Sequence, residues 1–181
     1  INEYGDTVGF GGRTLDNDCK HAKYLNSPEG PLFNKSVLIY GLYYLKKQRL
    51  DACVVVEGYM DVVMLSQYGI DGAVACMGTS LTAEQVKKLK WHCNEITFCF
   101  DGDSSGKRAT KKAYELILKF VDDHTRFRFI DLPEGYDPDS YCCEFGADKF
   151  KELCSNAIYL SEYIEEKLLS NTKAIPEQRV L

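Results

Sequence analysis

The sequence predicts an α/β fold in which a parallel sheet is covered by helices on both faces. Four short apolar segments of strand type alternate with helical segments between residues 51 and 132. This order of strands and helices is typical of parallel sheets with crossover helices. Acidic residues follow three of the four strands, and the carboxyl ends of parallel strands meet at one edge of a sheet. A functional site is therefore expected at that edge.

The segment before the sheet is rich in turn formers. Residues 7–16 contain several glycines and predict a strand with a bend, and residues 26–31 form a run of turn residues. A helix is expected over residues 39–47. Its apolar positions are Ile39, Leu42, Tyr43 and Leu45.

The first two strands of the sheet are expected at residues 51–57 and 72–77. Both are continuous apolar runs, as expected of strands with both faces covered. Between them, residues 60–67 carry the apolar face of a helix. After the second strand, Thr82 and Gln85 form the capping box of a helix that extends to residue 92.

The last two strands are expected at residues 95–100 and 126–132, and the fourth alternates Arg with Phe. A helix between them is marked by Ala109, Ala113, Leu116, Ile117 and Phe120. After residue 138 the character of the sequence changes. Helical spacing at Ala157, Leu160, Ile164 and Leu168 predicts the first helix or two of a helical subdomain.

Carboxylates are expected to converge at the carboxyl edge of the sheet. Glu57 ends the first strand, and Asp101 and Asp103 follow the third. Asp137 and Asp139 come after the fourth strand and a short loop. Converging carboxylates repel one another unless they are protonated or bound to cations. Since the donors are hard oxygens, Mg²⁺ is the expected cation, with Mn²⁺ as a substitute.

Each acidic group has a simpler interpretation by itself. A lone Asp-x-Asp is more often a solvated loop, and a lone Glu often does no more than end a strand. The joint placement after three strands is what favours a metal site. Residues 102–108 resemble a phosphate-binding loop and residues 9–12 a dinucleotide fingerprint, but both lack residues that these motifs require.

Composition excludes several classes of protein. The net charge of −5 argues against nonspecific nucleic-acid binding by bulk charge, although it permits a local basic groove. The 8 cysteines include no Cys-x-x-Cys pair, so reduced thiols and no zinc site are expected. Cys19 with His21 is the nearest approach to a metal pair, and further ligands are not in view. No apolar stretch approaches the ~18–20 residues of a membrane span, and a cytoplasmic protein is expected.

Basic and aromatic residues are interleaved before the sheet. They are Arg13, Lys20, Lys23, Lys35, Lys46, Lys47 and Arg49, with Tyr24, Phe33 and Tyr40. Such a mixture can contact phosphates and stack on bases, although scattered lysines on a solvated face are commoner. A second basic run lies where a helix is expected to begin, a place where the helix dipole disfavours positive charge. It comprises Lys107, Arg108, Lys111 and Lys112, and a bound polyphosphate, nearby carboxylates or simple solvation would each accommodate it.

Ordered motifs cover nearly the whole chain. They are Gly9-Phe-Gly-Gly-Arg13, Lys23-Tyr-Leu-Asn-Ser-Pro-Glu29, Phe33-Asn-Lys35, Leu38-Ile-Tyr-Gly-Leu42, Glu57-Gly-Tyr-Met-Asp-Val62, Leu65-Ser-Gln-Tyr-Gly69, Met77-Gly-Thr-Ser80, Asp101-Gly-Asp103 and Asp137-Pro-Asp139. In this order and spacing they resemble the bacterial DNA primases, which make RNA primers at replication forks. The Glu and Asp-x-Asp pattern alone would indicate only the wider Toprim group of topoisomerases, nucleases and primases.

The resemblance implies a division of the chain into three parts. Residues 51–133 would form a Toprim domain, a parallel sheet with flanking helices. Residues 1–50 would be the end of an RNA-polymerase-like α+β subdomain. Residues 134–181 would hold the third acidic motif and the start of a helical subdomain.

The resemblance also implies roles for individual residues. Glu57, Asp101 and Asp103 would bind catalytic Mg²⁺, and Asp61, Asp137 and Asp139 would complete the metal-binding acidic cluster. The residues that match the basic motifs, which hold the nucleotide and the template or nascent strand, are Arg13, Lys23, Tyr24, Asn26 and Lys35.

The implied activity is that of a DNA-directed RNA polymerase of primase type. It would use single-stranded DNA as template and ribonucleoside triphosphates as substrates, hold an RNA–DNA hybrid, and meet the replicative helicase through a region absent from this chain. The zinc-binding module of the family is also absent, so a fragment is expected.

One departure and two alternatives accompany this interpretation. Ser104-Ser105-Gly106 replaces the more usual basic-Ala-Gly, which bears on a phosphate contact there and not on the metal site. Another Toprim enzyme, a nuclease or topoisomerase, would share the acidic pattern. A noncatalytic nucleic-acid-binding relic would have lost carboxylates, whereas all six are present.

Overall fold

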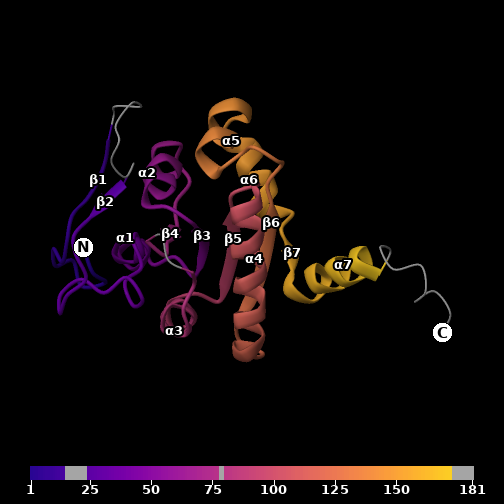
Figure 1. Cartoon of the computed structure of the whole chain (residues 1–181), viewed down its shortest axis with the longest axis horizontal. Helices are drawn as coiled ribbons and strands as arrows, with labels where there is room; N and C mark the ends of the chain where they lie inside the picture. Colours follow the sequence, from indigo (N-terminus) through magenta and orange to yellow (C-terminus); the bar gives the residue numbers. More distant parts are fainter. Residues whose placement is uncertain (15–23, 78–79, 173–181) are drawn as a thin grey trace.

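The computed structural model describes residues 1–14, 24–77 and 80–172, with a five-stranded sheet at its centre (Figure 1). In sheet order the strands are β4 (Ala73–Ala75), β3 (Ala52–Val56), β5 (Glu95–Phe100), β6 (Arg126–Asp131) and β7 (Ile158–Tyr159). The pairings from β4 to β6 are parallel, and β6 pairs with β7 antiparallel. The four strands predicted from the sequence and the α/β class are confirmed.

Helices connect the parallel strands in the predicted order. They are α2 (Tyr59–Gln67) after β3, α3 (Ala83–His92) after β4, and α4 (Ser104–Ile117) with the single turn η1 (Leu118–Phe120) after β5. The capping box of α3 is confirmed, because the Gln85 amide N–H donates to Thr82 Oγ1 at 3.2 Å. The helix predicted at residues 39–47 is α1 (Leu42–Gln48). It begins late because Gly41 has a φ of 87°, which is outside the helical region.

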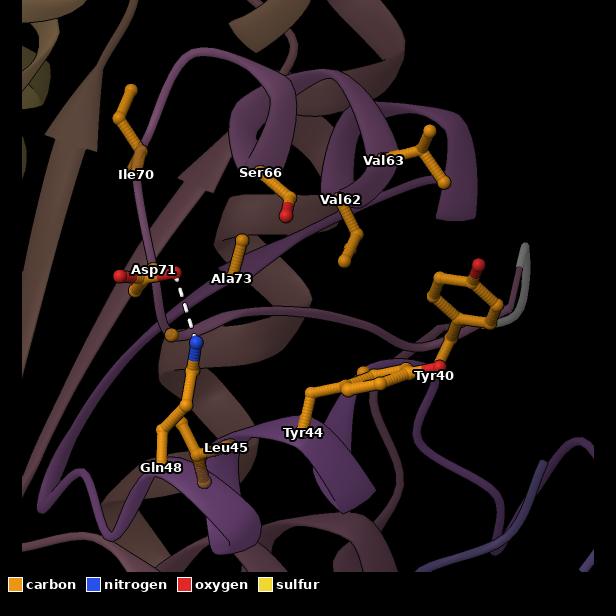
Figure 2. A pocket seen from close by; sticks show the side chains of 12 residues that line it. Tyr40, Tyr44, Leu45, Gln48, Val62, Val63, Ser66, Ile70, Asp71 and Ala73 are labelled. Carbon is orange, nitrogen blue, oxygen red and sulfur yellow. Dashed lines mark hydrogen bonds between the residues drawn. The ribbon is translucent and has the colours of Figure 1, made fainter. Parts of the chain in front are cut away.

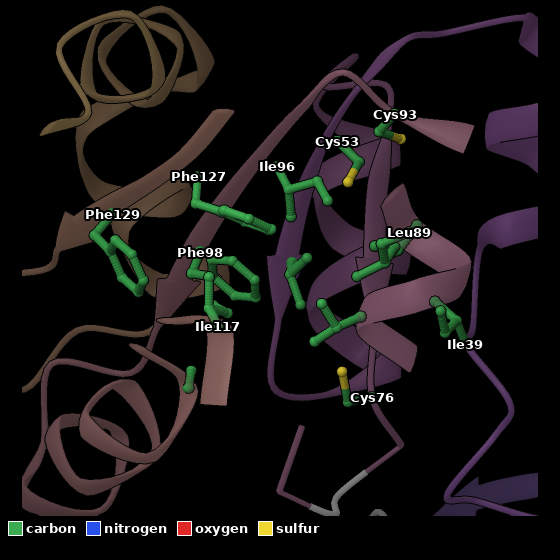
Figure 3. Packing of buried hydrophobic residues seen from close by; sticks show 14 of the residues in the cluster. Ile39, Cys53, Cys76, Leu89, Cys93, Ile96, Phe98, Ile117, Phe127 and Phe129 are labelled. Carbon is green, nitrogen blue, oxygen red and sulfur yellow. The ribbon is translucent and has the colours of Figure 1, made fainter. Parts of the chain in front are cut away.

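Two apolar cores lie on the two faces of the sheet. One contains side chains of α1, α3, α4 and α7 (Leu160–Thr172), and the other contains side chains of α2, α5 (Pro138–Phe145) and α6 (Ala147–Ser155). Successive residues of β5 point to opposite faces, so Phe98 belongs to the first core and Cys99 to the second. Figure 3 shows the first core, where the Phe98 ring stacks on the Phe129 ring with 5.3 Å between centroids.

The tail of the chain differs from the prediction. Ala157 was expected on a helix, but it precedes the strand β7, and α7 starts three residues later at Leu160. Arg128 of β6 holds this corner, because its Nε and Nη2 donate to the Ala157 carbonyl at 3.0 and 2.7 Å. The side chain of Leu168 lies outside the described residues. The tail therefore adds a short strand to the sheet before the last helix.

The segment before the sheet forms a small hairpin. The strand predicted over residues 7–16 is confirmed only as β1 (Gly11–Arg13), which pairs antiparallel with β2 (Tyr24–Asn26). Figure 1 shows this hairpin beyond the β4 edge of the sheet, at the opposite end from α7. Tyr40 adds an isolated antiparallel bridge to Ala75 of β4, so the segment is joined to that edge.

No disulfide joins any of the seven described cysteines, and five of them are buried. Cys19 and His21, weighed as a metal pair, lie outside the described residues. None of the helices that the structure describes is long and apolar enough to cross a membrane.

Candidate functional site

Four of the predicted carboxylates line one cavity of about 270 Å³ at the carboxyl edge of the sheet. They are Glu57, Asp61, Asp101 and Asp137, and Tyr24 and Asn26 of β2 line the same cavity. Glu57 follows β3 and Asp101 follows β5, two strands that are neighbours in the sheet. The parallel sheet thus brings together residues that are far apart in the sequence.

Glu57 and Asp101 are in direct contact. The Asp101 backbone N–H donates to Glu57 Oε1 at 3.2 Å. Asp101 Oδ1 is buried and has no hydrogen-bond partner within the part of the chain that the structure describes. Burial, with the charge of Glu57 next in importance, raises the pKa of Asp101 to about 7. Burial also raises the pKa of Glu57 above its usual value.

Asp61 faces the same cavity from the first turn of α2. Its Oδ2 accepts a hydrogen bond from the Gly58 N–H at 3.0 Å, which satisfies a donor at the start of the helix. Burial, with smaller contributions from the charges of Asp137, Asp139 and Glu57, raises the pKa of Asp61 to about 6. Carboxylates that raise one another's pKa form a site that favours a cation.

Asp103 and Asp137 each cap a helix with one carboxylate oxygen. Asp103 Oδ1 accepts the N–H groups of Ser105 and Gly106 at 2.7 and 2.8 Å, at the start of α4. Asp137 Oδ1 accepts the Ser140 N–H at 2.7 Å, at the start of α5. These contacts fix where the two carboxylates stand at the edge of the sheet.

Asp103 and Asp139 are near the cavity but do not line it. Asp103 raises the pKa of Glu57, so its charge is felt there. Asp139 lies in the first turn of α5, where burial and Asp137 raise its pKa and Arg13 lowers it. Arg13 of the hairpin therefore lies within reach of the acidic group.

The oxygen ligands of the site suit a hard divalent cation, but they are not arranged as a coordination shell. All the candidate ligands are carboxylates, and the buried, partnerless Asp101 Oδ1 is the kind of atom that a cation would satisfy. Among the described residues, however, no three His, Cys, Asp or Glu side chains are arranged as ligands of one metal ion. The chemistry of the site agrees with a hard divalent cation, while the side chains would need to turn to bind it.

The hairpin contributes a cationic and aromatic wall to the site. The Arg13 guanidinium lies 5.6 Å from the centroid of the Tyr24 ring, and Tyr24 meets the Tyr59 ring edge-on at 5.9 Å. Tyr59 also donates its hydroxyl to the Gly12 carbonyl at 3.2 Å, which joins α2 to β1. Tyr59 was not predicted as a site residue, because its contacts are with a hairpin more than thirty residues away in the sequence.

The remaining predicted residues are placed differently. Asn26 lines the cavity, and its Oδ1 is buried without a hydrogen-bond partner in the described structure. Lys35 does not line the cavity; its Nζ lies 5.9 Å from the centroid of the Phe33 ring. Lys23 lies outside the described residues.

Another cavity, of about 230 Å³, lies between α1, α2 and the β4 edge (Figure 2). Its walls are mainly apolar and aromatic, with Tyr40 and Tyr44 on one side and Val62 on the other. Gln48 Nε2 donates to Asp71 Oδ1 across its end at 3.0 Å. Because it contains none of the predicted site residues, it does not compete with the acidic cavity as the site.

Two family models match the chain. The model for the Toprim domain matches residues 51–130, and the model for the N-terminal domain of the DNA primase catalytic core matches residues 1–46. A curated DNA primase from Neisseria meningitidis is 47% identical over 170 residues, which are 92% of this chain and 28% of that protein. The chain belongs to the DNA primase family.

Solved structures of the family agree with this fold. A crystal structure of a primase domain from Pseudomonas aeruginosa has a TM-score of 0.87 and 44% identity, covering 94% of this chain and 53% of that one. The catalytic domain of a DnaG primase bound to single-stranded DNA has a TM-score of 0.87 and 41% identity, over 94% and 54% of the two chains. The chain thus spans about a quarter of the curated primase and about half of the solved primase domains.

Proposed function

We propose that this chain is part of a DNA primase that synthesises short RNA primers from ribonucleoside triphosphates on a single-stranded DNA template. The observation that carries the proposal is the convergence of Glu57, Asp61, Asp101 and Asp137 on one cavity, in a chain of the primase family. The solved relative that holds single-stranded DNA supports the choice of template.

The proposed reaction joins the 3′-hydroxyl of the growing primer to the α-phosphate of the incoming nucleotide. The new O–P bond forms as the bond from the α-phosphorus to the bridging oxygen breaks, the hydroxyl proton is lost, and pyrophosphate leaves. Mg²⁺, or Mn²⁺ as a substitute, would supply the positive charge that such a transfer requires. Glu57, Asp101 and Asp103 would hold it, and Asp61, Asp137 and Asp139 would complete the acidic cluster.

The basic and aromatic wall would hold the nucleotide and the nucleic acid. Arg13 and Tyr24 offer a guanidinium for phosphates and a ring for stacking, and both stand beside the acidic cavity. We assign Asn26, Lys35 and Lys23 to the same role from their place in the family motifs. An RNA–DNA hybrid would be bound here as the product.

The rest of the assignment follows from the family. The division into residues 1–50, 51–133 and 134–181 stays a prediction. We expect a cytoplasmic protein that meets a replicative helicase through a region outside this chain. A nuclease or topoisomerase is not favoured, because the curated relatives are DNA primases. A topoisomerase would also need a nucleophilic tyrosine from a partner domain.

The test is template-dependent RNA synthesis by the full product of the gene. The assay supplies single-stranded DNA, ribonucleoside triphosphates and Mg²⁺ or Mn²⁺, and compares the wild type with Glu57→Gln and Asp101→Asn. Glu84→Gln and Asp71→Asn are matched controls, because both carboxylates are exposed and outside the cavity. We expect short RNA products that the two site variants lose and the two controls keep. Strand cleavage without RNA synthesis would replace the primase assignment with a Toprim nuclease.

A further inference from the structure

Glu57 separates the acidic cavity from a second cavity of about 220 Å³. Within the part of the chain that the structure describes, it is the one residue that lines both. The walls of the second cavity come from the ends of β3 and β5 and from one side of α4. In Figure 1, α4 lies alongside β5 and packs on the sheet there.

The second cavity is basic, in contrast to the first. Arg108 and Lys112 line it, with the hydroxyl-bearing Ser80 and Ser105. Arg108 and Lys112 are four residues apart on α4, so their side chains share one face of the helix. Among the described residues, no carboxylate forms an ion pair with either cation, whereas Lys111 on the neighbouring face pairs with Glu115 at 3.9 Å.

This arrangement is mildly unfavourable without an anion. Both side chains are exposed, and two like charges four residues apart on a helix repel each other. The first N–H groups of α4 are not part of this anion site, because the Asp103 side chain already accepts the N–H groups of Ser105 and Gly106. A phosphate group would satisfy both cations, since a guanidinium binds phosphate oxygens in a bidentate manner.

The size and place of the cavity define the ligand. Drug-sized ligands occupy pockets of about 300–1,000 Å³, so a cavity of about 220 Å³ suits a short anion better than a whole nucleotide. Because Glu57 lines both cavities, this one lies next to the cavity where the α-phosphate would react. The proposed reaction releases a short polyanion, pyrophosphate, from this point.

We propose that Arg108 and Lys112 form a polyphosphate subsite that holds the β- and γ-phosphates of the incoming nucleotide and then the pyrophosphate that they become. This inference rests on the proposed function for its ligand, although the subsite itself can be tested without RNA synthesis. The two side chains bind and orient the leaving group and make no covalent bond.

Direct binding of inorganic pyrophosphate is the first test. Titration calorimetry is run at low salt in EDTA, so that divalent metal does not bridge the anion to the carboxylates. The double variant Arg108→Gln, Lys112→Gln should bind pyrophosphate at least about tenfold more weakly than the wild type. Lys111→Gln, Lys119→Gln removes the same charge from the neighbouring face of α4 and from η1, outside the cavity, and should bind as the wild type does. Equal weakening in both double variants would overturn the subsite, because bulk charge would then explain the effect.

Kinetics of RNA synthesis is the second test. In the full gene product, Arg108→Gln, Lys112→Gln should raise the KM for nucleotides and weaken inhibition by pyrophosphate about tenfold, with the control double variant unchanged. If RNA is made but neither quantity separates the two double variants, the subsite is wrong and the primase assignment stands. If no protein makes RNA, the primase assignment fails, and the calorimetric comparison still decides whether the anion site exists.

Discussion

A Cβ atom on Gly106 would lie 1.9 Å from the carbonyl oxygen of Asp101. The first turn of α4 therefore packs directly on the backbone at the end of β5, with no room for a side chain. The Gly106 N–H also donates to Asp103 at 2.8 Å. Gly106 thus allows the candidate metal ligands Asp101 and Asp103 to lie close together where β5 ends and α4 begins.

The first prediction is that Gly106→Ala destabilises the fold and disturbs the acidic site. The added methyl group must push α4 away from Asp101, which we expect to lower the free energy of unfolding by about 1–3 kcal/mol. Gly12→Ala and Gly30→Ala are controls, because a Cβ at either position meets no atom within 4 Å. Urea unfolding measures the free energy of unfolding of each variant relative to the wild type. An unchanged midpoint for Gly106→Ala would show that the helix shifts without cost.

The second prediction separates two roles of Asp137, as the N-cap of α5 and as a candidate metal ligand. Asn is as good an N-cap as Asp, so Asp137→Asn should keep the bond to the Ser140 N–H and change stability little. Asp137→Ala removes the cap and should cost about 1 kcal/mol. Both variants remove the charge and should weaken Mn²⁺ binding, measured by calorimetry, while the exposed Asp71→Asn should not. If Asp137→Asn binds Mn²⁺ as the wild type does, Asp137 is a cap and not a ligand.

The third prediction concerns Gln85, which is fully buried. Its Nε2 donates to the carbonyls of Lys35 and Leu38 at 3.0 and 2.9 Å, so α3 holds the segment that carries Lys35. Gln85→Leu keeps the approximate volume and leaves buried groups unpaired, which should lower the free energy of unfolding by about 2–4 kcal/mol.

The matched control for Gln85→Leu is Gln67→Leu, since Gln67 is exposed at the end of α2. The two proteins are compared by urea unfolding and by nucleotide binding. A loss of stability in Gln85→Leu with unchanged nucleotide binding would remove Lys35 from the proposed site. Equal stability in both variants would contradict the role of the hydrogen bonds.

The sequence predicts those parts of the fold and the site that depend on interactions between residues close together in the chain or on the order of the strands. The apolar run of β3 and the Thr82–Gln85 capping box are local signals, and both are confirmed. The convergence of Glu57 with Asp101 was also predictable, because the order of parallel strands places their ends at one edge.

Features that depend on distant partners were missed. Ile158 and Tyr159 form a strand of two residues, too short to show a period of two, and their pairing with β6 defines it. Ala157 matched a helical spacing by position alone, whereas the Arg128 guanidinium fixes it at a corner. The second role of Gln85, as an anchor of residues 35–38, gives no sequence signal because its partners are 50 and 47 residues away.

The fourth prediction concerns the pH dependence of stability in the absence of metal. Burial raises the pKa of Asp101 to about 7 and that of Asp61 to about 6, whereas unfolded Asp has a pKa of about 3.9. Because the folded pKa values are the higher ones, these groups stabilise the fold below about pH 4, and this contribution is lost as the pH rises towards 7. Asp122, with a pKa lowered to about 2, acts in the opposite direction at lower pH.

The difference between wild type and Asp101→Asn isolates the contribution of Asp101, because all other titrating groups are shared. In EDTA the melting temperature of the wild type should fall relative to that of the variant between about pH 4 and pH 7. Adding Mg²⁺ should reverse this fall above about pH 7, since a cation binds the charged carboxylates and stabilises the folded state by mass action. The variant should gain less from Mg²⁺. A wild-type-to-variant difference that does not change with pH in EDTA would mean that Asp101 is already charged in the metal-free fold, and that the cluster does not depend on a cation for its charge balance.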